Sequence, residues 1–373
     1  MEQTVILSDD NYKMLDDYLL THKVSKIFLV KSEFCDSFKI TDYFNGLTER
    51  LNIEIVSFTH YHPNPEYDSV VEGEKLFRET KCDCIAAVGG GSCIDVAKCI
   101  KLYYGLDSSK NYMQQSPIEN NIPLIVLPTT AGTGSEATRY AVIYYNDEKQ
   151  SITHDSIIPG AVIFDPSVLD TLPDYQRKAT MMDAFCHAIE AFWSVNSTEE
   201  SKKYSREAIR LVLENYKLYL NNDPVGNKNM LVAANIAGKA INITQTTAGH
   251  AMCYKLTNMY NTAHGHAAAI CVSVLWPFMI RHTDNCIDPR GESYLKNVFI
   301  ELADAMQSDS PLAAAEKFNE IFNETGLSIP VVNSDNDFEL LKKSVNPVRL
   351  KNNPVKLTED SIEKMYRSVL KLK

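Results

Sequence analysis

The sequence predicts an α/β domain built on a parallel sheet, followed by an all-α domain. Apolar runs at residues 27–30, 53–58, 84–88, 124–127 and 161–164 are typical of strands. None alternates clearly between apolar and polar residues, so we expect a sheet covered by helices on both faces. Amphipathic stretches at residues 10–20 and 72–79 predict helices between these strands.

The pattern changes after Leu172 and Pro173. From there the chain contains long segments with helical periodicity, at residues 175–194, 199–220, 229–243, 311–323 and 359–372. The chain has 373 residues, which favours two domains on length alone. We therefore predict an α/β domain over residues 1–172 and a helical domain over residues 173–373.

Composition narrows the functional classes. The chain is 45% hydrophobic and 23% charged, as ordinary globular proteins are, which argues against disorder and coiled coil. Its 37 basic and 48 acidic residues give a net charge of −11, so we expect no nucleic-acid partner and no membrane surface. The nine cysteines include no Cys-x-x-Cys pair. With no evident signal peptide or membrane span, they indicate a reduced, cytoplasmic protein.

A first glycine-rich motif follows the strand at residues 84–88. It reads Gly89-Gly90-Gly91-Ser92 and continues into a helical segment that contains Asp95. Glycines let backbone N–H groups approach an anion, and the start of a helix adds a favourable dipole. The motif matches neither the P-loop nor the usual dinucleotide fingerprint. It predicts a phosphate site, and a tight strand–helix turn without a ligand is the alternative.

A second motif follows the strand at residues 124–127. It places Thr129, Thr130, Thr133 and Ser135 around two glycines in one loop. Hydroxyls and free N–H groups of this kind hydrogen-bond phosphates and amides. The alternative is an ordinary polar surface loop.

A third group of residues suits a divalent metal. Asp183 and His187 lie four residues apart in a helical segment and so share one face. His250 and His264 lie in a second segment with few charges. One carboxylate with several imidazoles fits Zn²⁺ or Fe²⁺, although a lone helical histidine is more often a core or surface residue.

Together these motifs resemble the iron-containing (group III) alcohol dehydrogenase family, over nearly the whole chain. The resemblance rests on the two glycine motifs, on Asp165-Pro166 before Leu172-Pro173, on the Asp183-to-Glu190 segment and on His264-Gly265. It implies an N-terminal dinucleotide-binding domain and a helical domain, with a nicotinamide cofactor and one metal between them. It also implies reversible reduction of a small aldehyde to its primary alcohol, and a homodimer.

Site residues follow from the resemblance position by position. The metal ligands map to Asp183, His187, His250 and His264. The cofactor contacts map to Gly89, Gly90, Gly91, Ser92, Asp95, Thr129, Thr130, Thr133, Ser135 and Lys149.

The chain departs from the family at three places. Tyr254 stands where many members have a further histidine, and His266 is added after the last ligand. Tyr254 and His266 are therefore candidates for relaying a proton during catalysis, with packing in the wall of the site as the alternative. Ser32, next to Lys31, stands where NAD-preferring members often carry Asp, so we expect NADPH to be accepted as well as NADH.

Within the family, the chain is most similar to phosphonoacetaldehyde reductases. That similarity rests on residues 189–201, residues 237–257 and the Arg-Leu-Lys-Asn-Asn-Pro run that begins at Arg349. A phosphonate substrate needs cationic partners, and Lys255 and Arg349 are the leading candidates. A general short-chain alcohol or diol dehydrogenase is the main alternative. A dehydroquinate synthase-like lyase, a metal hydrolase and a non-enzymatic metal-binding protein are further alternatives.

Overall fold

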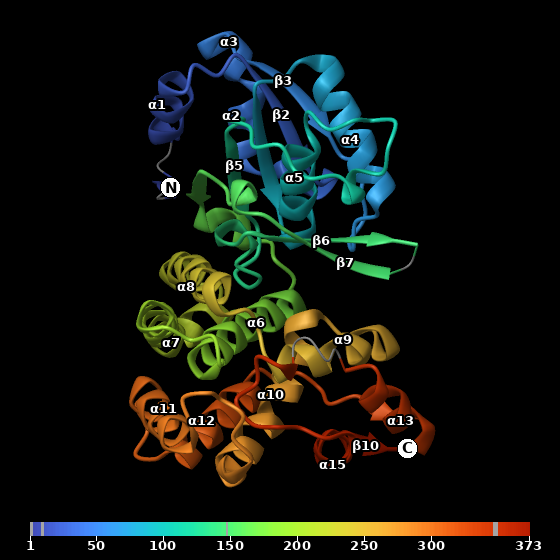
Figure 1. Cartoon of the computed structure of the whole chain (residues 1–373). Helices are drawn as coiled ribbons and strands as arrows, with labels where there is room; N and C mark the ends of the chain where they lie inside the picture. The colour runs from blue at the N-terminus through green and yellow to red at the C-terminus, as the bar shows by residue number, and fades with distance from the viewer. Residues whose placement is uncertain (1–2, 9–10, 147, 346–349) are drawn as a thin grey trace. The chain divides into compact units, whose positions relative to one another are not determined.

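A computed structural model describes residues 3–8, 11–146, 148–345 and 350–373 of the chain (Figure 1). It divides into two compact units. The first comprises Met1–Thr130 and Gly134–Thr171, and the second comprises Ala131–Thr133 and Leu172–Lys373. The short piece of the second glycine motif at residues 131–133 therefore groups with the helical unit, although its sequence position lies before Pro173.

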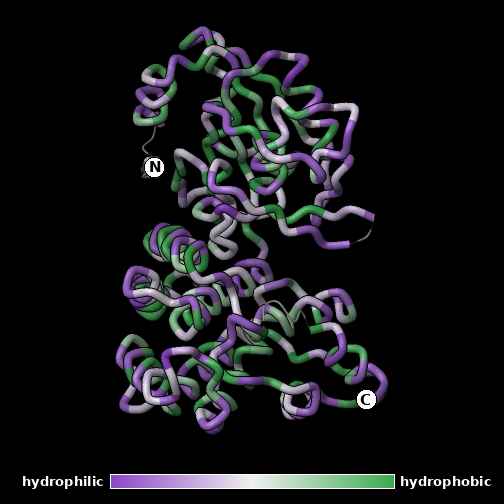
Figure 2. The backbone as a smooth tube through the Cα atoms, in the orientation of Figure 1, coloured by the Kyte–Doolittle hydropathy of each residue, from purple (hydrophilic) through white to green (hydrophobic). Residues whose placement is uncertain are grey.

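The first unit is built on a six-stranded sheet with the order β1-β8-β5-β4-β2-β3, in which all pairs are parallel. Its strands are β1 (Thr4–Leu7), β2 (Lys26–Lys31), β3 (Glu54–Phe58), β4 (Cys84–Gly89), β5 (Leu124–Pro128) and β8 (Ala161–Phe164). The predicted α/β class is confirmed. Every residue of β4, β5 and β8 is buried, which explains why their sequences show no alternation. Figure 2 shows hydrophobic colouring gathered in the middle of this unit.

The helices of this unit connect successive strands. They are α1 (Lys13–Thr21), α2 (Lys39–Asn45), α3 (Leu47–Leu51), α4 (Tyr67–Thr80) and α5 (Gly91–Tyr103). Residue 10, where the first helix was predicted to begin, lies outside the described residues. An antiparallel hairpin of β6 (Tyr140–Tyr145) and β7 (Glu148–Thr153) was not predicted, and neither was β1.

The second unit consists mainly of helices. They are α6 (Asp174–Trp193), α7 (Glu199–Leu220), α8 (Pro224–Thr244), α9 (Ala248–Tyr260), α10 (His264–Arg281), α11 (Glu292–Ala305), α12 (Pro311–Glu324), α13 (Asp335–Lys343) and α15 (Glu359–Val369). The last predicted helix ends three residues early, and Lys371–Leu372 pairs instead with Val331–Val332 as a short parallel strand. Among the described residues, no helix is both long and apolar enough to span a membrane.

Helix α6 is the centre of the second unit, because α7, α8 and α10 all pack against it. Every residue from Met181 to Trp193 is buried, so this helix has no solvent-facing stripe over its last three turns. Capping residues in the sequence mark where the neighbouring helices α7 and α8 begin. Thr198 and Ser201 form a capping box at the start of α7, and the Asp223 side chain caps α8 just before Pro224.

A buried lysine holds the loops of the first unit together. Lys98 lies on α5 with its side chain fully enclosed, and four oxygens lie within hydrogen-bonding distance of its ammonium group, which has three hydrogens to share among them. Two are backbone carbonyls, of Ser135 and of Tyr140 at 2.8 Å, and two are the hydroxyls of Ser135 at 3.1 Å and Thr138 at 3.2 Å. Lys98 therefore joins the helix after the first glycine motif to the loop that contains the second.

Replacing Lys98 with Met should destabilise the first unit, because four buried oxygens would lose their donor. Removing one partner of a buried charged network costs about 3–5 kcal/mol of unfolding free energy. The measurement is urea unfolding followed by circular dichroism. The exposed Lys75 on α4 offers a control, and Lys75→Met should leave stability almost unchanged. Equal stability of Lys98→Met and wild type would show that the network carries no net stabilisation.

Candidate active site

The first glycine motif forms the turn between β4 and α5. Gly89 ends the strand and Gly91 begins the helix. A Cβ atom on Gly89 would lie 2.4 Å from the Cβ of Cys93, so the turn is too tight for any side chain at this position. The first N–H groups of α5 have no partners inside the helix and form a favourable site for a phosphate.

This turn lies where the order of the sheet reverses. The chain moves from β2 outward to β3, and then returns to place β4 on the other side of β2. In open parallel sheets, ligands bind beside the carboxyl ends of the strands at such a reversal. Here those ends carry Ser32, just after β2, and the Gly89–Gly91 turn, just after β4. The predicted cofactor contacts on both strands therefore meet at one edge of the sheet.

Residues of the second glycine motif meet the same edge. The backbone N–H of Thr129 donates to the carbonyl of Gly89 at 3.0 Å. The Ser135 hydroxyl donates to Asp95 at 2.7 Å, and the other Asp95 oxygen accepts from the N–H of Val142 at 2.9 Å. Burial raises the pKa of Asp95, an effect that the charge of Lys98 partly offsets. Asp95 thus ties α5 to the loop and to β6.

The remaining predicted cofactor contacts are spread over several segments of the chain. Thr130 packs beside Gly90, and the Ser92 hydroxyl accepts from the N–H of Asn64 at 3.4 Å. Lys149 is exposed on β7, and its charge, like that of Lys98, partly offsets the burial that raises the pKa of Asp95. Thr133 belongs to the second unit.

A cavity of about 460 Å³ opens beside the ends of β2 and β3, and its lining includes Glu33, His60, His62, Asn64 and Ser69. Ser32 is half-buried next to it. Lys31, the basic neighbour of Ser32, is buried and contacts the Asp36 carboxylate. Its charge is therefore already balanced within the protein.

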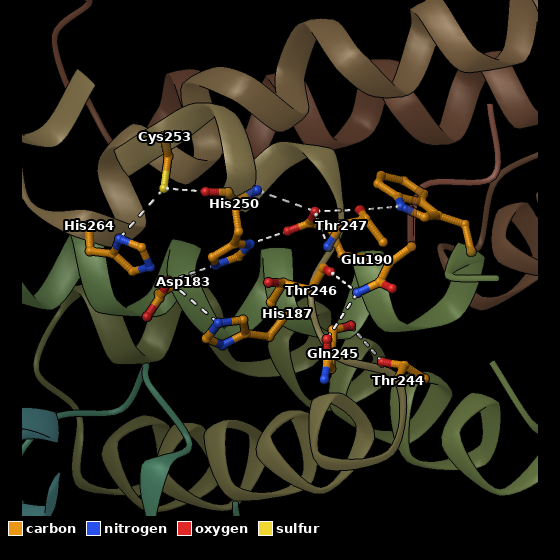
Figure 3. A network of polar contacts seen from close by, with 12 residues as sticks. Asp183, His187, Glu190, Thr244, Gln245, Thr246, Thr247, His250, Cys253 and His264 are labelled. Atoms are coloured by element: carbon orange, nitrogen blue, oxygen red, sulfur yellow. Dashed lines mark hydrogen bonds and ion pairs between the residues drawn. The ribbon is translucent and has the colours of Figure 1, made fainter. Parts of the chain in front are cut away.

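The second unit brings three of the predicted metal ligands together. Asp183 and His187 lie one turn apart on α6, and His250 reaches them from α9 (Figure 3). One ligand atom from each lies within 4.8 Å of the others, and all three residues are buried. The Asp183 carboxylate is 3.4 Å from Nε2 of His250 and 3.9 Å from Nε2 of His187. Burial raises the pKa of Asp183, but the facing histidines outweigh this effect and bring it below its usual range.

The fourth predicted ligand, His264, lies beside this group at the start of α10. Its ring centre lies 5.3 Å from that of His250, and its Nδ1 lies 3.5 Å from the Cys253 sulfur. Tyr254 stacks on the His264 ring at 5.7 Å with an interplanar angle of 12°. The hydroxyl-bearing side chain predicted as a proton relay therefore lies against a predicted ligand.

A buried carboxylate stands behind His250. Glu190, on α6, is fully buried and contacts Nδ1 of His250. It also accepts from the Thr247 hydroxyl at 2.5 Å and from the Thr247 N–H at 3.1 Å (Figure 3). Burial raises the pKa of Glu190, but the attraction of His250 and these hydrogen bonds outweigh it and lower that pKa. Burial would lower the pKa of His250, but Glu190 and Asp183 raise it to about 9.

Glu190 ends the Asp183-to-Glu190 motif, and no role for it was predicted from the sequence. Asp183, His187 and Glu190 are spaced by four and three residues, which places all three on one face of α6. A buried helix that carries three ionisable groups on one face is the signal that could have identified Glu190.

Two glycines allow α9 and α10 to approach α6 closely. A Cβ atom on Gly249 would lie 3.0 Å from the Glu190 carboxylate and 2.6 Å from Val272. A Cβ atom on Gly265 would lie 2.1 Å from the Ala179 carbonyl and 2.5 Å from the Cβ of Asp183. Each glycine adjoins a predicted ligand, His250 or His264, so close packing is what brings both imidazoles to Asp183.

Three other predicted site residues are not part of this group. Two lie elsewhere in the second unit, and one is not among the described residues. His266 faces Tyr175, whose hydroxyl is 3.1 Å from its Nδ1, and Phe322. It is two residues after His264 on a helix, so it points to a different side, and its role in a relay stays a prediction. Lys255 is half-exposed on α9 beside Tyr254. Arg349 lies outside the described residues.

Comparison with known proteins identifies the family. Residues 3–166 match the iron-containing alcohol dehydrogenase family, and residues 178–370 match the Fe-containing alcohol dehydrogenase family, C-terminal. The chain belongs to the iron-containing alcohol dehydrogenase family. The resemblance inferred from its motifs is thereby confirmed.

The relatives of this chain differ in length. Phosphonoacetaldehyde reductase of Streptomyces viridochromogenes is 30% identical over 315 residues, which cover 80% of this chain and 79% of the relative. Aldehyde-alcohol dehydrogenase 2 of Entamoeba histolytica is 31% identical over 70% of this chain, but the chain spans only 31% of that longer protein. The iron-containing alcohol dehydrogenase of Thermococcus thioreducens shares the fold, with a TM-score of 0.87 at 20% identity over 99% of this chain and 98% of that one.

Replacing Gly265 with Ala should weaken metal binding. The added methyl group would overlap the Ala179 carbonyl and push the start of α10, with His264, away from Asp183. We expect the dissociation constant for Zn²⁺ to rise about tenfold, since a misplaced ligand costs on the order of 1–2 kcal/mol. Competition with a chromophoric chelator measures it.

Gly46→Ala is a suitable control for this substitution. The nearest atom to its added Cβ would be 3.5 Å away, which is ordinary contact, so metal affinity should not change. If Gly265→Ala bound Zn²⁺ as tightly as wild type, close packing at this glycine would not be what places His264.

Proposed function

We propose that the protein is a metal-dependent NAD(P)H oxidoreductase that interconverts a small aldehyde and its primary alcohol. Its specific reaction is reduction of phosphonoacetaldehyde to 2-hydroxyethylphosphonate. The observation that carries the proposal is the buried group of Asp183, His187 and His250, whose ligand atoms lie within 4.8 Å of one another. The same chain has a glycine turn at the reversal point of a parallel sheet.

The side chains present fit a divalent metal. One carboxylate and imidazole nitrogens are the ligands that Fe²⁺ and Zn²⁺ accept, and a buried group of this kind is costly unless its charges are balanced. We propose that Asp183, His187, His250 and His264 hold one such ion. When bound, the ion would polarise the carbonyl group of the substrate, and the nicotinamide would supply the hydride.

The protein's own residues bind the cofactor and donate the proton that the alcohol product requires. The start of α5 and the hydroxyls of the second glycine motif bind the diphosphate, while Asp95 fixes the loop that carries Ser135. Tyr254, which lies flat against His264, has a hydroxyl that can give a proton to the alcohol product. The adenosine end of the cofactor would lie in the cavity beside Ser32 and His62.

The phosphonate assignment has two supports. A relative named phosphonoacetaldehyde reductase is 30% identical over most of both chains. In this chain, Asn352 donates to Gln245 and to the Thr246 carbonyl, both at 3.2 Å. The segment at residues 350–353 is thereby attached to the turn that precedes His250. That segment continues the run that begins at Arg349, which we propose as a phosphonate contact together with Lys255.

A general alcohol or diol dehydrogenase is the second candidate. Alcohol dehydrogenase 4 of Schizosaccharomyces pombe is 27% identical over 88% of this chain, and a short-chain alcohol needs none of the basic residues named above. A dehydroquinate synthase-like lyase is a third candidate and would leave no net change in the cofactor. We further propose a homodimer located in the cytoplasm, in keeping with nine free cysteines.

A panel of small aldehydes tests the substrate. After reconstitution with Fe²⁺ or Zn²⁺, kcat/KM for phosphonoacetaldehyde should exceed that for propanal by about tenfold or more, because charged hydrogen bonds are worth about 1.5–3 kcal/mol each. Oxidation of NADH or NADPH, followed by absorbance, measures both. Lys255→Met should lower the rate with the phosphonate and leave propanal unaffected. Equal kcat/KM for the two aldehydes would favour the general alcohol dehydrogenase, and no net cofactor oxidation would favour the lyase.

Ser32→Asp tests the cofactor proposal. A carboxylate at this position should repel the 2′-phosphate and raise the dissociation constant for NADPH about tenfold, with little change for NADH. Quenching of intrinsic fluorescence measures both constants. Ser32→Asn is the neutral control, since an Asn side chain has nearly the same size as Asp but carries no charge. If wild type already binds NADH a hundredfold more tightly than NADPH, another residue, such as the nearby Glu33, controls the choice.

A further inference from the structure

A fully buried carboxylate next to the proposed metal ligands has no part in the function described so far. Glu190 is 0% exposed, and its nearest partners are the ring of His250 and the turn at Thr247. It lies on the far side of His250 from Asp183: Glu190 contacts Nδ1, whereas Asp183 is 3.4 Å from Nε2. The imidazole is therefore held between two carboxylates, one at each nitrogen (Figure 3).

Hydrogen-bond donors lie around the Glu190 carboxylate. Its Oε1 accepts from the Thr247 hydroxyl at 2.5 Å, from the Thr247 N–H at 3.1 Å and from the His250 N–H at 3.4 Å. Its Oε2 faces Nδ1 of His250. Oε1 therefore accepts from three donors, and Oε2 is the oxygen that is left for the imidazole.

This arrangement suits one tautomer of His250. A neutral ring that holds a metal through Nε2 keeps its hydrogen on Nδ1, where the Glu190 carboxylate lies to accept it. The lone pair of a neutral His250 then resides on Nε2, which is the nitrogen that faces Asp183. Nε2 is also the His250 atom through which the ring would hold a metal.

We propose that Glu190 is a positioning residue, which fixes the ring orientation and tautomer of His250 and adds a second negative charge beside the metal. This rests on the proposed function, because it assumes that His250 is a ligand. Carboxylate–histidine–metal arrangements raise the basicity of the ligand, and losing the outer carboxylate costs about 10–100-fold in metal affinity. Two carboxylates, Asp183 and Glu190, would then balance a divalent ion in a buried site.

Other features of the chain support this arrangement. The Thr247 hydroxyl that donates to Glu190 also accepts from the indole N–H of Trp193 at 2.9 Å, so its direction is fixed. Gly249 leaves the space that brings the start of α9 onto the carboxylate, since a Cβ there would lie 3.0 Å from Oε1. Glu190 is therefore held rigidly as well as buried.

The substitution Glu190→Gln preserves size but not the hydrogen-bond pattern. A Gln side chain has one accepting oxygen and one donating nitrogen, whereas both sites around Glu190 require an acceptor. With its nitrogen toward His250, it would force the ring hydrogen onto Nε2 and block the metal. With its nitrogen toward Thr247, the Gln NH₂ group would face the Thr247 N–H, so that two donors would meet with no acceptor between them.

The test measures metal affinity directly. The dissociation constant of the apoprotein for Zn²⁺, measured by chelator competition, should rise about 10–100-fold in Glu190→Gln. With Co²⁺, the visible absorption bands of the variant should shift, because the ligand field changes. Glu74→Gln is the matched control: Glu74 is also 0% exposed and accepts from the Tyr112 hydroxyl at 2.7 Å, but it lies in the first unit. The control should bind Zn²⁺ as wild type does.

A measurement on wild type keeps the proposal testable if Glu190→Gln does not fold. In protein labelled with ¹⁵N-histidine and loaded with Zn²⁺, the His250 ring should show a hydrogen on Nδ1 and metal on Nε2. Metal on Nδ1, or a folded Glu190→Gln with affinity within twofold of wild type, would overturn the inference. If wild type itself bound no divalent metal, the proposed function would fail first, so the two failures are distinguishable.

Discussion

The second unit depends on one constraint, which is that charged groups lie in a part of α6 that has no exposed face. From Met181 to Trp193, every side chain of α6 is buried, yet Asp183, His187 and Glu190 all lie there. An isolated buried carboxylate is strongly unfavourable, so each must be matched by a partner within the interior. His250 matches both carboxylates at once, and α9 must therefore pack at one particular position on α6.

That position explains the small residues around it. Gly249 and Gly265 each lie beside a histidine and each lacks room for a methyl group. In most helix pairs a larger side chain would fill such a contact and add apolar burial. Here the chain gives up that burial so that the imidazoles reach Asp183. Packing and chemistry are thus set by the same two residues.

Much of this could be predicted from the sequence, for identifiable reasons. The central strands are continuous apolar runs, and the Asp183–His187 spacing places both on one helical face, so fold class and part of the metal group were accessible. The contacts of Lys31 and His266 were not. Lys31 pairs with Asp36 only because of the short helical turn at Glu33–Ser37, and His266 meets Tyr175 across 91 positions of sequence. Such pairings depend on tertiary packing, which local pattern does not contain.

The two units share a way of building a site. In the first, Lys98 lies three residues after Asp95 on α5 and holds the loop that carries Ser135 and Thr138. In the second, Glu190 lies three residues after His187 on α6 and holds Thr247 and His250 at the start of α9. Lys98 donates hydrogen bonds to the loop that it holds, whereas Glu190 accepts them from the segment that it holds.

A spacing of three residues keeps Lys98 on the same helix face as Asp95, and Glu190 on the same face as His187. The helix then sets the distance between them, and the loop can be placed only where both are satisfied. Each motif therefore contains a residue proposed to contact a ligand, and also a buried charged side chain, Lys98 or Glu190, that fixes the neighbouring segment. This accounts for why the motifs extend one turn beyond the residues that the chemistry itself would require.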